Sequence, residues 1–228
     1  MSSGNVFETL FKQLAAILKL VVDGKRDPEE VSGVLQTIID GKDFDISSTL
    51  SKWHAFYRKF FGIELELSGI KIPECKPGFN RVLVIAKGLT LNQVYDVLAE
   101  QFPCWRCVDD LDKGVPKNDR TTNQTYAIRV RDRVEADEEL KNLSADQLKE
   151  KGVVGITLLE RMIFELKYWD ETAKHLDINN WTLCAGSRGS VGRVPRAGWH
   201  GGGFRVGWCR SGGCGGFVRS RSVVSCPA

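Results

Sequence analysis

The residues best suited to chemistry form a C-x-x-C motif, Cys104-Trp105-Arg106-Cys107. A zinc site would need a second pair of ligands at a matching spacing. The remaining candidate ligands form no such pair: Cys75, Cys184, His54 and His175. A redox motif is expected at a helix N-terminus, where a thiolate is stabilised, whereas this one follows the end of a predicted helix. We therefore interpret Cys104 and Cys107 as structural thiols, with a metal site and a redox pair as alternatives.

Three nearby carboxylates, Asp109, Asp110 and Asp112, could begin a site for a hard cation such as calcium. Their spacing does not fit an EF-hand loop and Lys113 follows at once, which favours a solvated turn. The acidic stretch 135–139 is likewise interpreted as a solvated face. The sequence contains no phosphate-binding glycine loop, zinc-protease motif or nucleophile elbow, and its three histidines have no neighbouring nucleophile. We therefore predict no catalytic residue, cofactor or metal.

The segment 185–228 uses a restricted set of residues. It holds 12 Gly, 7 Arg, 6 Ser and 3 Cys among its 44 positions, and no Lys, Asp or Glu. These four types share codons that end in GC, and an AAC asparagine codon whose adenines are replaced reaches all of them. Trp199 and Trp208 cannot arise in that way. The pattern therefore indicates adenine-directed mutagenesis over a fixed framework.

Two simpler interpretations compete with mutagenesis. One is a disordered Gly/Arg-rich tail with some attraction for RNA, and the other is a GC-rich stretch read out of frame. Against both, residues 193–199 and 204–208 alternate fixed apolar residues with small or changeable ones. A period of two is what a half-buried strand requires. We therefore favour a diversified binding surface.

The charge of the 228-residue chain is unevenly distributed. The net charge is +3, yet residues 178–228 carry seven Arg and no acid, while the first 177 residues hold 25 basic and 29 acidic side chains. The C-terminal segment is thus +7 and the remainder −4. We recognise no signal peptide and no membrane span, and the seven cysteines are an odd number. These features predict a cytoplasmic protein.

Residues 1–62 are predicted to be a helical module for packing or oligomerisation. A capping box at Asn5 and Glu8 opens the first helix, Asp27-Pro28 opens the second, and an aromatic-rich third helix ends before Gly62. Residues 63–180 mix strands at 63–67, 81–86 and 126–131 with helices. The predicted helix starts are after Thr90 and at two capping boxes, Ser144 with Gln147 and Thr157 with Glu160.

Several motifs within this organisation carry a family resemblance. Four lie in the C-terminal segment: Cys184-Ala185-Gly186-Ser187-Arg188, Arg193-Val194-Pro195-x-x-x-Trp199, Val206-x-Trp208 and Val218-Arg219-Ser220-Arg221. Five stretches lie upstream, at 23–28, 102–105, 109–113, 131–139 and 174–177. On these residues the chain resembles the variable proteins of diversity-generating retroelements, within a branch from small-genome bacteria and archaea. In that family a reverse transcriptase copies an invariant template with adenine-specific errors and overwrites the end of the gene.

The resemblance implies an α+β chain in which N-terminal helices precede a C-type-lectin-like domain over 63–228, with a variable region at about 185–228. It implies binding of an unknown protein or other macromolecular ligand rather than catalysis. The implied variable positions are Arg193, Arg196, Gly198, His200, Gly201, Gly202, Gly207, Cys209, Arg210, Ser211, Gly212, Gly213, Cys214, Gly216 and Phe217. The implied scaffold residues are Trp181, Trp199, Arg205, Trp208 and Arg219.

The main alternative is a nucleic-acid-binding module that uses the basic Gly/Arg-rich segment, since arginines interspersed with aromatic residues can contact phosphates and stack on bases. The binding-surface hypothesis makes the sharper structural prediction. It requires residues 181–228 to form ordered strands and loops that pack on helices around 90–102 and 158–175. Trp199 and Trp208 should be largely buried, and most variable positions should be exposed on one contiguous face.

Overall fold

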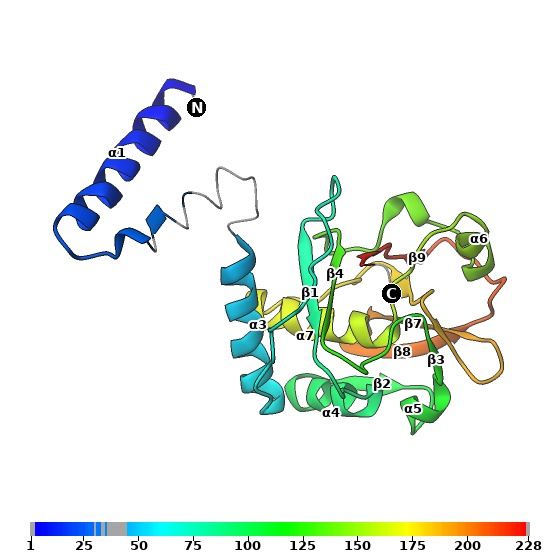
Figure 1. Cartoon of the computed structure of the whole chain (residues 1–228). Helices are drawn as coiled ribbons and strands as arrows, with labels where there is room; N and C mark the ends of the chain where they lie inside the picture. Colours follow the sequence, from blue (N-terminus) through cyan, green and yellow to red (C-terminus); the bar gives the residue numbers. More distant parts are fainter. Residues whose placement is uncertain (1–2, 30, 33–34, 36–44, 227–228) are drawn as a thin grey trace. The chain divides into compact units, whose positions relative to one another are not determined.

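The computed structural model describes residues 3–29, 31–32, 35 and 45–226. The chain has a mixed α+β architecture, in which N-terminal helices precede several sheets with interspersed helices (Figure 1). It divides into two compact units, Met1–Ser51 and Lys52–Ala228. No helix in the described part of the chain is both long and apolar enough to cross a membrane.

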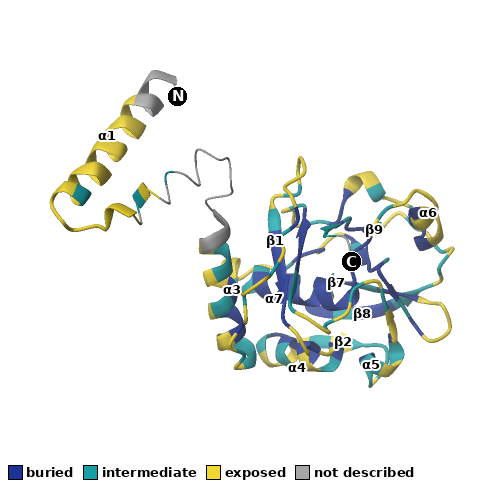
Figure 2. Cartoon of the chain, viewed as in Figure 1, coloured by how far each residue is buried: buried dark blue, intermediate teal, exposed yellow. Residues whose placement is uncertain are grey.

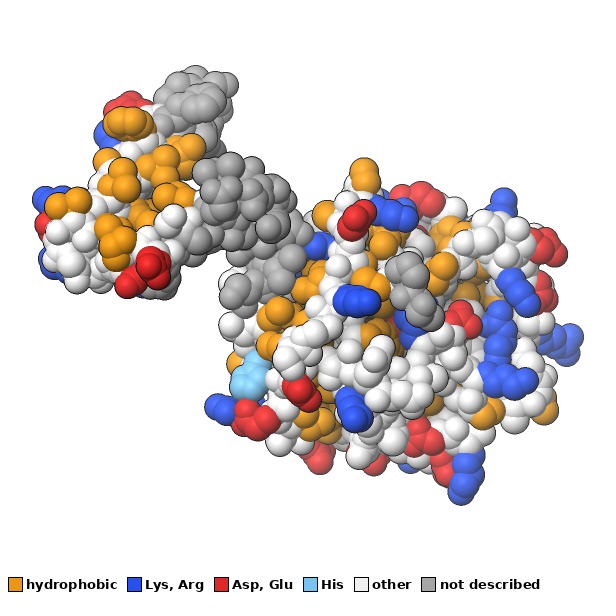
Figure 3. Space-filling view, viewed as in Figure 1, with side chains coloured by type: hydrophobic (Ala, Val, Ile, Leu, Met, Phe, Trp, Pro, Cys, Tyr) orange, Lys and Arg blue, Asp and Glu red, His pale blue; other side chains and the backbone are white. Residues whose placement is uncertain are grey.

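The smaller unit contains helix α1, Ser3–Val22. It begins before Asn5, so the predicted capping box does not mark its start. Gly24 follows the helix with a φ of +67°, and the Lys25 amide donates to the Leu20 carbonyl, which closes the helix as predicted. The apolar side chains of α1 are exposed (Figures 2 and 3): Leu10, Phe11, Leu14, Ile17, Leu18, Leu20 and Val22. Most of the predicted second helix lies outside the described residues.

Helix α3, Asp45–Phe61, crosses the boundary between the units, and its aromatic half belongs to the larger one. Trp53, Phe56 and Tyr57 are buried there. The Tyr57 hydroxyl donates to the Val84 carbonyl at 2.7 Å, and the Trp53 indole donates to Val82 at 3.3 Å. These aromatic residues, which the sequence analysis assigned to the helical module, therefore pack on the first strand of the larger unit.

The described residues of the larger unit contain three sheets. The first has the order β1-β4-β10, with β1 Arg81–Ile85, β4 Tyr126–Val130 and β10 Val224–Ser225. The second has the order β2-β8-β7-β5-β9, with β2 Cys104–Arg106, β5 Trp181–Leu183, β7 Val194–His200, β8 Gly203–Cys209 and β9 Val218–Ser220. A short ladder joins β3 Lys117–Asn118 to β6 Ser187–Arg188.

The strands predicted at 81–86 and 126–131 are confirmed, whereas the one predicted at 63–67 is wrong. Leu65 is buried and its neighbours Glu64 and Glu66 are exposed, so the alternation does place an apolar side chain inward. However, the segment does not join a sheet in the described chain. Alternation of apolar and polar residues indicates which side of a segment is buried, but it does not determine whether the segment pairs with another strand.

Helices α4 Leu91–Gln101, α6 Ala145–Glu150 and α7 Leu158–Thr172 start at the predicted sites, and each has a complete capping box. Two shorter elements are α5 Leu111–Gly114 and the 3₁₀ helix η1 Glu138–Leu140. Helix α7 is buried over its first ten residues and contacts both β1 and β7 (Figure 2). It therefore joins the first sheet to the second.

A buried ionic network, which was not predicted from the sequence, holds the second sheet in place. The Asp177 carboxylate is fully buried and accepts hydrogen bonds from Arg161 and Arg221, each at 2.8 Å, and from Thr182 at 2.5 Å. Its burial opposes ionisation, but Arg221 and Arg161 lower the pKa of Asp177 below its usual value. The Trp199 amide donates to the Asp177 carbonyl at 3.1 Å. Helix α7 and β5 are thus fixed to the side chain of Asp177, and β7 is fixed to its main-chain carbonyl.

The stretch 135–139 is a solvated face, as predicted, only at Glu138 and Glu139, which are exposed. Asp137 is buried, and its carboxylate accepts from Arg131 at 2.6 Å and from the Ser222 amide at 2.9 Å. Glu135 accepts from the side chains of Asn179 and Asn180. These acids are structural, because they join the 131–139 loop to the C-terminal strands.

Candidate binding face

The hairpin of β7 and β8 carries the centre of the predicted variable region. The two strands are antiparallel, and their pairing runs from Val194 opposite Cys209 to His200 opposite Gly203. The two turn residues, Gly201 and Gly202, have φ values of +59° and +76°, the left-handed conformation that a tight two-residue hairpin turn requires. Adjacent side chains of a strand point to opposite faces, so the hairpin separates its residues into an inward and an outward set.

The inward set consists of Pro195, Ala197, Trp199, Phe204, Val206 and Trp208. Ala197, Phe204 and Val206 are fully buried. Trp199 stacks on His175 with ring centroids 3.3 Å apart and meets Phe102 edge-on at 5.6 Å. The predicted packing on the helices around 90–102 and 158–175 is therefore confirmed.

Both tryptophans point inward, although neither is fully buried. Trp208 lies over two glycines, because a Cβ built on Gly189 would meet its ring at 3.0 Å and one on Gly114 would meet it at 3.6 Å. The predicted direction of the two side chains is right, and the prediction that they are largely buried is confirmed, since well under half of each residue is exposed.

On the outward face, Arg196, Trp181 and His200 form a stack. Trp181 precedes Thr182, which pairs with Ala197, so Trp181 lies opposite Gly198. The Arg196 guanidinium lies 4.4 Å from the Trp181 ring, and the His200 ring lies 4.1 Å from it at 24°. Arg196 lies two residues before Gly198 and His200 lies two residues after it, so both side chains are on the same face of β7. Because Trp181 lies opposite Gly198, these two side chains flank its ring. The His200 Nε2 donates to the Asn180 carbonyl at 3.2 Å, and burial lowers the pKa of His200.

This stack lines a surface depression with a volume of about 600 Å³, which we call the Trp181 hollow. Eight of the predicted variable positions line it: Arg196, His200, Cys209, Arg210, Gly213, Cys214, Gly216 and Phe217. The other lining residues are Asn179, Trp181, Gly215 and Val218. At the opposite end of the outward face, Leu183 and Val194 pack with Ala145 and Leu148 of α6. The hollow is therefore the part of this face that α6 leaves open.

The remaining predicted variable positions lie elsewhere. Arg193, Gly201, Gly202 and Gly212 are exposed, Ser211 is half-buried, and Gly198 and Gly207 are buried. A Cβ on Gly198 would meet the Asn180 carbonyl oxygen at 3.0 Å and that of Asp177 at 3.1 Å. Position 198 thus has no room for a side chain, whereas no described atom lies within 4 Å of a Cβ on Gly216.

Most arginines of the C-terminal segment are engaged within the protein. Arg188 donates to the carbonyls of Ala185 and Ser187, and Arg205 to that of His200. Arg219 pairs with Glu138 at 2.5 Å, and Arg221 pairs with Asp177. The side chains of Arg193 and Arg210 are exposed and form no ion pair with the described residues. The free positive charge is therefore smaller than the +7 of the sequence indicates.

The other motifs have structural roles. Asp110 caps α5 by accepting from the Lys113 amide at 3.0 Å, and Asp112 accepts from the Leu91 amide at 2.7 Å, at the start of α4. The described residues contain no group of three or more His, Cys, Asp or Glu that could hold a metal ion. Burial raises the pKa of Cys104 to about 12 and also raises the pKa of Cys107, which opposes thiolate chemistry.

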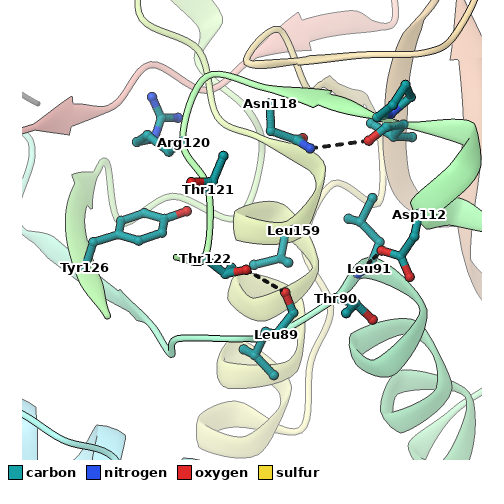
Figure 4. Close-up of a pocket in the computed structure, with 12 residues that line it drawn as sticks. Leu89, Thr90, Leu91, Asp112, Asn118, Arg120, Thr121, Thr122, Tyr126 and Leu159 are labelled. Atoms are coloured by element: carbon teal, nitrogen blue, oxygen red, sulfur yellow. Dashed lines mark hydrogen bonds between the residues drawn. The ribbon is translucent and has the colours of Figure 1, made fainter. Parts of the chain in front are cut away.

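A second pocket, of about 260 Å³, lies between the β3–β4 segment and the starts of α4 and α7 (Figure 4). Its polar groups are engaged with neighbours. Arg120 forms a bidentate ion pair with the buried Glu160, with hydrogen bonds of 2.6 and 2.8 Å, and Tyr126 donates to the same carboxylate at 3.0 Å. Thr122 donates to the Leu89 carbonyl at 2.9 Å, and Asp112 holds α4. We therefore regard this pocket as structural.

Comparisons with protein-family models, with curated proteins and with solved structures find no match for this chain.

Proposed function

We propose that this chain is a non-catalytic binding protein whose outward β7–β8 face and adjoining loop are diversified by adenine-directed mutagenesis. The observation that carries the proposal is the separation of residue types in the hairpin. The two tryptophans, which an altered AAC codon cannot produce, point inward, whereas eight substitutable positions converge on the Trp181 hollow. A surface can change its side chains without loss of fold only if its inward residues are left unchanged.

The rest of the fold supports such a role. The Asp177 network and the His175–Trp199 stack fix β5 and β7 from behind, on the side away from the hollow. A rigid platform reduces the conformational entropy that is lost on binding. We also propose that residues 63–228 form the C-type-lectin-like domain that the resemblance implies, with the hollow on its ligand-binding face.

The nucleic-acid alternative is weaker. Four of the seven arginines are engaged within the protein, and both faces of the Trp181 ring are flanked by side chains, so a base cannot stack on it. A salt titration with a single-stranded oligonucleotide tests this alternative. Phosphate-driven binding would give a log–log slope of about −0.7 per phosphate. We expect weak binding throughout.

Two matched libraries test the proposal. In the first, four outward positions are randomised: Arg210, Cys214, Gly216 and Phe217. In the control, four inward positions are randomised: Ala197, Phe204, Val206 and Trp208. We expect most clones of the first library to remain protease-resistant and to include binders to an arbitrary protein target, and most control clones to unfold. Equal loss of folding in both libraries would contradict the proposal, and so would a well-folded first library that contains no binder.

A further inference from the structure

The Trp181 hollow of this chain is lined by two arginines, Arg196 and Arg210, and by no described acidic residue. Glu135, on an adjoining loop, is already engaged, because it accepts from the Asn179 amide at 3.0 Å and from the Asn180 side chain at 2.8 Å. The Asp146 carboxylate of α6 lies 3.6 Å from a Cβ built on Gly212 and is not part of the lining. Arg210 has no ion pair with the described residues, and Arg196 is held against Trp181 rather than against an acid.

The same hollow offers an apolar contact. Phe217, which lines the hollow, is 72% exposed. The Trp181 ring is flanked by Arg196 and His200, so it presents an edge to the hollow rather than a face. A flat base would therefore find one free aromatic face, that of Phe217, whereas an aliphatic or aromatic side chain of a peptide can pack against both groups.

The two arginines favour an anion with planar geometry. A guanidinium binds a carboxylate through two parallel hydrogen bonds, and such charge-assisted bonds are stronger where water is partly excluded. Arg196 is pre-oriented by its contact with Trp181, so less side-chain entropy is lost when it binds. A volume of about 600 Å³ is within the usual range for a ligand-binding pocket.

We propose that the hollow of this chain binds an acidic protein segment, in which a carboxylate pairs with Arg196 and Arg210 and a neighbouring apolar side chain packs on Phe217. The inference rests on the proposed function, because it assigns a ligand class to the same face. A nucleic acid is disfavoured, since a phosphate backbone needs a row of free cations and most arginines of this segment are engaged within the protein.

Selection of a random peptide phage library on the immobilised full chain tests this assignment. We expect enrichment of peptides with Asp or Glu next to an aromatic or aliphatic residue. A selected peptide should bind the Arg196→Gln/Arg210→Gln double variant about 10- to 100-fold more weakly, as expected for the loss of hydrogen bonds between charged groups. Replacement of its acidic residue by the matching amide should weaken binding to a similar extent.

Arg193→Gln is the matched control, because Arg193 is an exposed arginine of the same segment that does not line the hollow. It should leave peptide affinity unchanged, and thermal unfolding of each variant separates lost binding from lost folding. Non-acidic peptides that still require Phe217 would overturn the ligand class and leave the proposed function standing. Peptides that bind every hollow variant equally would overturn both. If a single-stranded oligonucleotide binds the chain more tightly than any selected peptide, and Arg193→Gln also weakens that binding, the proposal that the ligand is a protein segment would be overturned.

Discussion

Gly198→Ala is expected to destabilise the protein although position 198 belongs to the predicted variable set. The added Cβ would lie 3.0 Å from the Asn180 carbonyl oxygen, 3.1 Å from that of Asp177 and 3.0 Å from the His200 Nε2. Asp177 cannot easily yield, because its carboxylate is held by two arginines and its φ is +54°. His200 could move only by leaving its stack on Trp181.

The magnitude follows from two opposing effects. Insertion of a methyl group into a tightly packed site costs about 1–3 kcal/mol. Loss of glycine flexibility in the unfolded chain returns about 0.4–1 kcal/mol. The net loss should be about 1–2 kcal/mol, and since each 1 kcal/mol lowers the Tm of a domain of this size by about 2–4 °C, the Tm should fall by about 2–8 °C.

Thermal and urea unfolding of Gly198→Ala and Gly216→Ala measure this difference. Gly216 is a matched control in the same variable set, because its φ is not in the left-handed region and no described atom lies within 4 Å of a Cβ there. Its variant should be as stable as the parent or up to about 1 kcal/mol more stable, because only the entropy effect of the unfolded chain acts there. If the two variants have the same stability, the reasoning about a closed site at 198 is refuted.

Three further predictions concern other parts of the larger unit. Trp208→Ala should cost about 2–3 kcal/mol of unfolding free energy in urea, less than for a fully buried Trp because part of this side chain is exposed. Arg210→Ala, on the outward side, should stay within about 0.5 kcal/mol of the parent. Equal effects would contradict the separation of the hairpin into inward and outward side chains. Asp177→Asn should cost about 3–5 kcal/mol at pH 7, since it leaves two arginines without their partner in a buried site, and a loss below about 1 kcal/mol would contradict that role for the network. Cys214 is exposed and should react with a maleimide at pH 7 far faster than Cys104, because burial raises the pKa of Cys104 to about 12. Mass spectrometry of the labelled chain measures the two rates. Comparable rates would show that Cys104 is a reactive thiol.

Local features of the fold could be predicted from the sequence because their causes are local. The capping boxes at Thr157 and Ser144 each depend on residues three apart, and both helices start there. Strand alternation at 193–199 and 204–208 likewise identified which residues of the hairpin point inward. By contrast, the strand predicted at 63–67 failed, because a strand also needs a partner that its own sequence does not specify.

The contacts that define the site could not be predicted, because they join distant segments. The stack of Trp181 with Arg196 and His200 depends on the register between β5 and β7. The Asp177–Arg221 pair joins residues 44 positions apart. One signal was available in the sequence, since Arg161 interrupts the otherwise apolar face of the predicted helix at 158–173. A charge in such a position needs a buried partner.

The most direct test of diversification is to sequence the DNA around this gene in its source. We expect a near-copy of the segment encoding residues 185–228, beside a reverse-transcriptase gene, that differs from the coding copy only where the near-copy holds adenine. The differing codons should include those of Arg196, Arg210, Cys214 and Phe217 in the hollow, while the Trp199 and Trp208 codons should be identical in both copies. Absence of such a copy, or differences spread evenly over all four bases, would contradict the central claim.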